Sequence, residues 1–337
     1  MSSAPALDLV ATPHVSLQNG SLRSAGQPSR LSLCERCRLA GIPFARDRRA
    51  HMPTLLGIPF DVNSSYLRGP AGAPAKIREA FRGDASNKWT ELGVDLGVVG
   101  AFADAGDLRL RDSRATVGDD FAEIERAVGD LLDKGERPVS LGGDHSITYP
   151  VLRAFARHDL EVTIIHFDAH PDLYDEFEGS RVSHACPFAR IMEERLAKRL
   201  VQVGIRTING HQREQAVRLG VEVVEMRALP AYERLEIQGP VYVSFDMDVL
   251  DPAFAPGVSH REPGGMTVRE AVAHLHAIAG NIVGADIVEY NPGQDVSGMT
   301  ATVAAKILKE IMGKMIGGSE SGFVRAQLRT SVNREKT

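Results

Sequence analysis

From Pro53 onward, short apolar runs alternate with longer stretches in which apolar residues recur at helical spacing. Apolar runs of about four to eight residues are typical of buried strands. The expected strands are residues 54–58, 98–102, 138–141, 162–167, 200–205, 221–225, 241–245 and 282–288. The expected helices are residues 75–81, 121–133, 147–157, 183–196, 212–219, 268–279 and 299–312. This alternation is typical of βα units and predicts an α/β protein with an eight-stranded, mainly parallel sheet.

The helix expected at residues 268–279 has the clearest boundary. Thr267 can cap its first turn, and Glu270 three positions later completes a capping box. Its apolar residues share one face at helical spacing: Val268, Ala271, Val272, Leu275 and Ile278. We expect that face to cover the sheet.

The two ends of the chain differ from the middle in composition. Residues 1–51 are rich in Ser, Arg, Ala and Pro and contain seven arginines but few acids. This composition resembles an organellar transit peptide, although a disordered extension is the interpretation we favour. A short polar and basic tail begins at Gly317. We therefore expect an N-terminal extension at residues 1–51, a folded domain at 52–316 and a tail at 317–337.

Overall composition and charge exclude several classes of protein. The chain has 337 residues, of which 43% are hydrophobic, enough for a sizeable core. Its net charge of -5 and pI of about 6.1 do not provide the basic surface that nucleic acid requires, and they suit a small cationic substrate. No apolar run reaches the roughly 18 residues that a membrane span needs. We expect neither a nucleic-acid nor a membrane partner.

The cysteines bear on the cellular compartment. Cys34, Cys37 and Cys186 form an odd and sparse set, which argues against a disulfide framework and for a reducing compartment. Cys34 and Cys37 form a single CxxC pair with no second pair, so we expect no zinc site there. We expect a cytoplasmic protein, or a protein of the mitochondrial matrix or another organelle if residues 1–51 are a transit peptide.

Polar residues able to do chemistry gather where apolar runs end. Ligands of open α/β sheets bind outside the carboxyl ends of the strands, so a shared placement there indicates one site. The sequence GGDHS follows the strand expected at residues 138–141. Its glycines allow a tight turn, and His145 can bind a metal through a neutral imidazole. Alone, this signal is weak.

The sequence DAHPD follows the strand expected at residues 162–167. Alternate residues of an extended segment point to the same side, so Asp168, His170 and Asp172 are expected to project together. Two carboxylates this close repel one another unless a cation lies among them. A solvated turn is the less favoured interpretation.

A third group, SFDMDVLDP, ends the strand expected at residues 241–245. Asp246 and Asp248 have the same spacing of two residues, whereas Asp251 before Pro252 is expected to form a turn. Glu289 ends the last expected strand and could receive a planar guanidinium through two hydrogen bonds.

Four aspartates and two histidines make a hard set of oxygen and nitrogen donors, which favours Mn²⁺ and leaves Ni²⁺, Co²⁺, Fe²⁺ and Zn²⁺ open. Six donors are too many for one catalytic ion, so we expect two ions. The expected ligands are His145, Asp168, His170, Asp172, Asp246 and Asp248.

These motifs resemble the ureohydrolase family, which includes arginases, agmatinases and guanidinobutyrases. The resemblance runs from about residue 54 to residue 315 and implies a three-layer α/β/α arginase-type fold, a catalytic domain at residues 52–316, and assembly as a homotrimer or homohexamer. It implies one manganese ion on His145, Asp168, Asp172 and Asp246, and a second on Asp168, His170, Asp246 and Asp248. It also implies that His184 moves protons to the leaving amine and that Glu289 pairs with the guanidinium.

The resemblance implies a guanidino substrate but does not fix the chemical group at the other end of that molecule. The loop after DAHPD is similar to that of plant-type arginases, which favours L-arginine, with agmatine, guanidinobutyrate and guanidine as alternatives. Asp175, Glu176 and Glu178 would accept a second cationic group, and a carboxylate would need Arg181 or Arg261. A non-catalytic binding protein or a one-zinc deacetylase of similar architecture would be expected to lack part of the six-ligand pattern.

Overall fold

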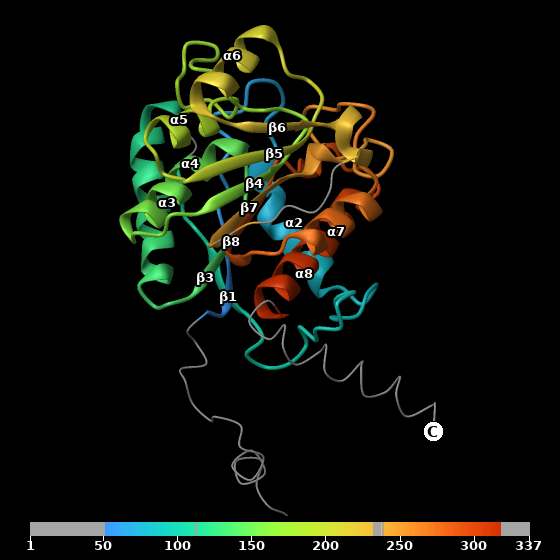
Figure 1. The fold of residues 1–337 in the computed structure, drawn as a ribbon. Helices are drawn as coiled ribbons and strands as arrows, with labels where there is room; N and C mark the ends of the chain where they lie inside the picture. Colours follow the sequence, from blue (N-terminus) through green and yellow to red (C-terminus); the bar gives the residue numbers. More distant parts are fainter. Residues whose placement is uncertain (1–50, 112, 232–236, 238, 318–337) are drawn as a thin grey trace, which may run out of the picture. The chain divides into compact units, whose positions relative to one another are not determined.

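The computed structural model describes residues 51–111, 113–231, 237 and 239–317 (Figure 1). The expected N-terminal extension before His51, the pair Cys34 and Cys37, and the expected tail after Gly317 lie outside these residues. Of the helices described, none has both the length and the apolar character that crossing a membrane requires.

The described residues form a sheet of eight strands in the order β2-β1-β3-β8-β7-β4-β5-β6. All neighbouring strands are parallel. The strands are β1 (Pro53–Gly57), β2 (Ala103–Asp107), β3 (Arg137–Leu141), β4 (Thr163–Phe167), β5 (Arg199–Ile205), β6 (Glu222–Glu225), β7 (Pro240–Asp246) and β8 (Asn281–Val288). The prediction of an α/β fold with an eight-stranded parallel sheet is confirmed.

Helices cover both faces of this sheet and complete three layers (Figure 1). One layer contains α3 (Val117–Leu132), α4 (Thr148–Arg157), α5 (Pro187–Glu193) and α6 (Gly210–Leu219), and the other contains α2 (Ala73–Arg82), α7 (Val268–Ala277) and α8 (Met299–Gly317). Adjacent strand residues point to opposite faces, so Leu55 and Leu56 enter different hydrophobic cores. Burial on both faces explains why the central strands are almost continuously apolar.

The strand predicted at residues 98–102 is wrong. Val98 and Val99 are 59% and 98% exposed, and the chain pairs with β1 only afterwards, at β2. β2 has the polar sequence ADAGD and lies at the edge of the sheet. Arg78 of α2 bonds to Asp104 and Asp107. Ion pairs and backbone pairing hold this strand, so hydrophobicity could not reveal it.

The helix predicted at residues 183–196 is shorter than expected. α5 begins at Pro187, whose fixed backbone angle suits the first turn of a helix, and it ends at Glu193. Residues 183–186 instead form a loop that carries His184. Cys186 is fully buried at the end of this loop.

The turn after β3 needs glycine because two chain segments approach closely. A Cβ added at Gly143 would lie 1.6 Å from the backbone oxygen of Phe60. The amide of Asp144 donates to that same oxygen at 2.8 Å. The turn places His145 at the carboxyl end of β3, in the middle of the sheet, next to β8.

Candidate metal centre

The first half of the site is centred on His145. Its Nδ1 lies 3.1 Å from Asp168 Oδ2, 3.2 Å from Asp172 Oδ2 and 3.0 Å from Asp246 Oδ2. All four residues are buried. The structure therefore brings residues at or just after the ends of β3, β4 and β7 to one point at the carboxyl edge of the sheet.

The second half of the site is centred on His170. Its Nδ1 lies 3.4 Å from Asp168 Oδ1 and 3.0 Å from Asp248 Oδ2. Asp168 thus faces His145 with one carboxylate oxygen and His170 with the other. All six ligands expected from the sequence lie in one cluster, and Asp168 is shared between its halves.

The aspartates converge by a different local geometry from the extended alternation that the sequence suggests. His170 donates its backbone N–H to Asp168 Oδ1 at 2.5 Å, and Asp248 donates its backbone N–H to Asp246 Oδ1 at 2.7 Å. Asp172 has a left-handed backbone with φ of 48°. Tight turns capped by the aspartates themselves therefore aim these side chains.

The cluster has the charge pattern that a bound cation would satisfy. Burial raises the pKa of Asp246, and the nearby carboxylates of Asp248 and Asp168 raise it further. His145 Nδ1 faces carboxylates but forms no well-directed hydrogen bond, although it is buried. Buried like charges are costly without a counter-charge. Because the donors are hard and an imidazole nitrogen is left without a hydrogen bond, the residues fit a divalent metal site.

His184 and Glu289 form a pair beside the cluster. Glu289 has φ of 60° directly after β8, and its Oε1 accepts from the His145 backbone N–H and faces His184 Nδ1, both at 2.9 Å. On the other side of the ring, His184 Nε2 lies 2.8 Å from Ser65 Oγ. Burial alone would lower the pKa of His184, but the adjacent Glu289 carboxylate raises it to about 9.

Comparison with known proteins agrees with this geometry. The model of the arginase family matches residues 52–313. The chain belongs to the arginase family. It is 48% identical over 276 residues to the mitochondrial arginase 1 of Arabidopsis thaliana. The aligned segment covers 78% of this chain and 80% of that protein. It is 37% identical over 264 residues to the agmatinase of Bacillus subtilis (strain 168), covering 77% of this chain and 90% of the agmatinase.

Solved structures of this family have the same fold. The arginase from Medicago truncatula superposes with a TM-score of 0.75 at 45% sequence identity, covering 79% of this chain and 88% of that one. The proclavaminate amidinohydrolase from Streptomyces clavuligerus gives a TM-score of 0.70 at 31% identity, over 79% of this chain and 92% of the other.

Sequence reasoning missed a buried network behind His145. Asp286 of β8 accepts hydrogen bonds from Thr148, Tyr242 and Ser244 at 2.9, 2.7 and 2.7 Å. Ser244 gives its single proton to Asp286, so its oxygen accepts from His145 Nε2 at 2.9 Å. The imidazole proton is thereby held on Nε2, and the Nδ1 lone pair points toward the carboxylates. A charged residue inside an apolar strand was the available signal.

His166 is a second residue that the sequence prediction omitted. Its Nε2 lies 2.7 Å from Asp168 Oδ2, and its ring stacks on Phe188 with centroids 3.9 Å apart. Burial lowers the pKa of His166, which favours its neutral form. His145, His166 and Asp168 offer donor atoms close enough together to share an ion. The histidine in the otherwise apolar run of β4 was the signal for it.

The arginines expected near the substrate carboxylate are engaged elsewhere. Arg181 forms ion pairs with Asp175 and Glu193. Arg261 donates to the backbone oxygen of Pro256 and to Gln294. Neither expectation is supported by the structure.

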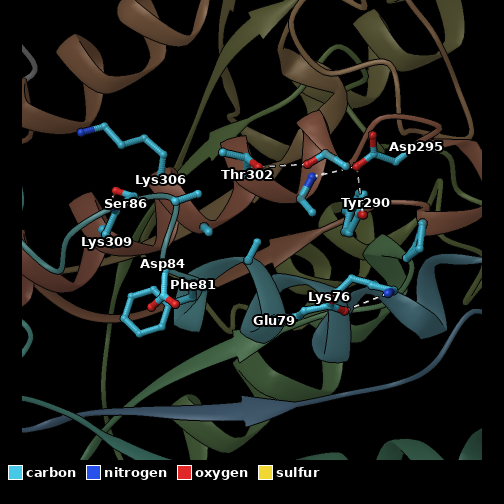
Figure 2. A pocket seen from close by; sticks show the side chains of 17 residues that line it. Lys76, Glu79, Phe81, Asp84, Ser86, Tyr290, Asp295, Thr302, Lys306 and Lys309 are labelled. Atoms are coloured by element: carbon cyan, nitrogen blue, oxygen red, sulfur yellow. Dashed lines mark hydrogen bonds and ion pairs between the residues drawn. The ribbon is translucent and has the colours of Figure 1, made fainter.

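A separate cavity of about 740 Å³ between α2 and α8 contains none of the predicted site residues (Figure 2). Its lysines lie near acidic or polar partners, as in the pairs of Lys76 with Glu79 and of Lys306 with Glu310. Asp295 lines it and accepts from the hydroxyl of Tyr290, the residue after Glu289. The chemistry predicted from the sequence therefore does not lie in this cavity.

Proposed function

We propose that this chain is an arginase, which hydrolyses L-arginine to L-ornithine and urea with a pair of divalent metal ions. The observation that carries the proposal is the single cluster of six donors, five of them buried and His170 partly exposed, with the His184–Glu289 pair beside it. Membership in the arginase family and 48% identity to a plant arginase support it. The family match also supports residues 52–316 as the catalytic domain.

The shared position of Asp168 supports a division of the donors into two sets. We propose that His145, Asp168, Asp172 and Asp246 hold one ion, and that Asp168, His170, Asp246 and Asp248 hold the other. Mn²⁺ is the proposed metal because the donors are carboxylates and imidazoles. When bound, two such ions provide Lewis acidity and make water a nucleophile at neutral pH.

The protein residues then position the substrate and the proton. Glu289 pairs with the guanidinium and holds its central carbon at the cluster. As water adds to that carbon and the bond to the δ-nitrogen breaks, this nitrogen needs a proton to leave as the ornithine amine. The Glu289 carboxylate raises the pKa of His184 to about 9, which favours the protonated ring that can supply this proton as a general acid. Ser65 holds the second ring nitrogen of His184 in place.

Urea release tests this function. The manganese-loaded protein, and in parallel the nickel-loaded protein, are compared on L-arginine, agmatine, guanidinobutyrate and guanidine. We expect L-arginine to have the highest kcat/KM. Preference for agmatine would instead support the second candidate, an agmatinase, which the Bacillus relative suggests. No urea from any of the four would contradict both.

His184 can be tested separately from the metals. The variant His184→Ala should keep the manganese content of the wild type and lose about 10²–10⁴-fold in kcat. Unchanged turnover would remove His184 from the mechanism. Loss of manganese in this variant would contradict the division between proton transfer and metal binding.

Oligomeric state and location stay predictions. We propose a homotrimer or homohexamer, which light scattering coupled to gel filtration distinguishes from a monomer. The Arabidopsis relative is named as mitochondrial, whereas we keep the cytoplasm as the expectation for this chain and the mitochondrial matrix as the alternative. A fluorescent protein fused after residues 1–51 distinguishes the two locations. A diffuse signal would support the cytoplasm, and a mitochondrial signal would support the matrix.

A further inference from the structure

Arg206 follows β5 directly and contacts the segment that carries Asp168 and His170. Its backbone N–H donates to the backbone oxygen of Ala169, the residue between these two proposed ligands, at 2.9 Å. The backbone N–H of Ala169 donates in turn to Asp248 Oδ1 at 3.2 Å. The backbone of Arg206 is therefore joined through Ala169 to a third proposed ligand, Asp248.

The side chain of Arg206 holds two further segments together. Its guanidinium donates to the backbone oxygens of Asp248 and Val249 at 2.7 and 3.2 Å. Two of its nitrogens donate to the backbone oxygen of Glu262, at 2.6 and 3.0 Å. An arginine has five N–H donors in a fixed planar fork, so one side chain can bind several carbonyl oxygens at once. Arg206 thus links the turn after β7, which carries Asp248, to the segment that carries Glu262.

The side chain of Glu262 faces His170 from the side opposite the cluster. Its Oε1 lies 3.6 Å from His170 Nε2, whereas His170 Nδ1 faces Asp168 and Asp248. At 3.6 Å the contact is electrostatic and is not a hydrogen bond. A carboxylate near the second nitrogen of a metal-binding imidazole helps to fix the orientation of the ring. By holding the backbone at Glu262, Arg206 therefore also supports the orientation of His170.

The guanidinium of Arg206 is bound by backbone oxygens alone. Within the part of the chain that the structure describes, Arg206 forms no ion pair, and each hydrogen bond that its side chain donates ends on a carbonyl oxygen. Gly265 provides the space for it, because a Cβ at this position would lie 2.7 Å from Arg206 Nη2. The side chain therefore fits a position between segments of the fold, and no carboxylate there requires its charge.

We propose that Arg206 is a positioning residue for one of the two proposed ions. This ion is the one assigned above to Asp168, His170, Asp246 and Asp248. His145 and Asp172 are proposed ligands of the other ion only, and neither is hydrogen-bonded to Arg206. The inference rests on the proposed function, because it needs the binuclear centre. Removing the guanidinium should weaken binding of the ion on His170 and spare the ion on His145.

Manganese binding to full-length variants tests this role without turnover. Arg206→Met removes the guanidinium, and Arg206→Lys keeps a positive charge but places it on a single nitrogen without the planar fork. Residues that orient metal ligands typically contribute about 10-fold to 100-fold to metal affinity. In calorimetric titration with Mn²⁺ we expect two ions in the wild type. Each variant should bind one of them as the wild type does and the other weaker by that factor.

Electron paramagnetic resonance provides a second measurement, because two Mn²⁺ ions that share a carboxylate have coupled spins. We expect the wild type to give the spectrum of a coupled pair. At a manganese concentration that just fills the wild type, Arg206→Met should give the spectrum of an isolated ion. If Arg206→Met does not fold, Arg206→Lys decides the question by the same two measurements.

Arg78→Met is the matched control. Arg78 is also a buried guanidinium, but it bonds to Asp104, Asp107 and the backbone of Gly106 at the edge strand β2. This variant should lower the free energy of unfolding and leave both manganese dissociation constants unchanged. If it weakens the second ion as much as Arg206→Met does, the loss follows general destabilisation and the positioning role is refuted.

The outcomes separate this inference from the proposed function. Two ions bound by both Arg206 variants as tightly as by the wild type would overturn the positioning role, and so would equal weakening of both ions. A wild type with a coupled manganese pair that releases no urea from L-arginine would contradict the arginase proposal and leave the positioning role intact. A wild type without a coupled pair would overturn the inference together with the binuclear centre.

Discussion

Removing the Ser244 hydroxyl should weaken metal binding, although Ser244 is not among the proposed ligands. In Ser244→Ala, His145 Nε2 loses the acceptor at 2.9 Å that fixes its proton. Residues that orient a metal-binding histidine in this way typically contribute about 10-fold to 100-fold to metal affinity. We therefore expect the manganese dissociation constant to rise by that factor. The buried N–H left without an acceptor should also cost about 1–3 kcal/mol of unfolding free energy.

Thr148→Val provides the matched control. Thr148 donates to the same Asp286 carboxylate at 2.9 Å but, unlike Ser244, is not hydrogen-bonded to His145 Nε2. Valine has nearly the same shape, so this variant removes one donor to Asp286 and keeps the link between Ser244 and His145. We expect a similar loss of stability with a much smaller change in manganese affinity.

Competition with a chelating dye measures the manganese affinity, and urea denaturation measures the free energy of unfolding. The two variants must differ in the first quantity and resemble each other in the second. If Thr148→Val weakens manganese binding as much as Ser244→Ala, the orientation of His145 through Ser244 is refuted. The orientation of His145 through Ser244 is also refuted if Ser244→Ala binds manganese as tightly as wild type.

Three further changes test other parts of the structure. Asp246→Ala should abolish urea release because it removes a donor proposed for both ions, and retained activity would refute the site. Gly143→Ala should destabilise the protein by about 1–3 kcal/mol or more in a denaturant titration, since its Cβ would lie 1.6 Å from the Phe60 oxygen. Burial opposes ionisation of Glu310, but a hydrogen bond from Lys306 helps hold its pKa below the ordinary value. The ionised Glu310 carboxylate therefore stabilises the fold above its ordinary pKa, and this stabilisation is lost as pH falls through the lowered pKa. Glu310→Gln should reduce the free energy of unfolding at pH 7 and flatten the decline of that free energy in acid. An unchanged profile of stability against pH would contradict the role of Glu310.

The central strands could be predicted from the sequence because both of their faces are buried. Residues 162–167 and 241–245, for example, are nearly continuous apolar runs, and the structure has β4 and β7 there. The edge strand β2 could not be found in this way, because side chains at the edge meet solvent and ion pairs. Hydrophobic patterning reports burial, so it does not detect elements that are held mainly by backbone pairing.

The ligands of the candidate site could be predicted for a related physical reason. A carboxylate such as Asp168 or Asp246 at the end of an apolar strand is costly unless something compensates it, so its presence indicates a site. The residues that support this site gave weaker signals. Asp286 and His166 lie inside strands, where a single polar residue can also be structural.

Manganese stoichiometry tests the central claim most directly. Elemental analysis of the protein after saturation with Mn²⁺ and gel filtration should give two ions per chain for the wild type. Asp168 faces both histidines of the cluster, so Asp168→Ala should reduce the content to less than one. A single ion in the saturated wild type, or two ions retained in Asp168→Ala, would contradict a binuclear centre built on this cluster.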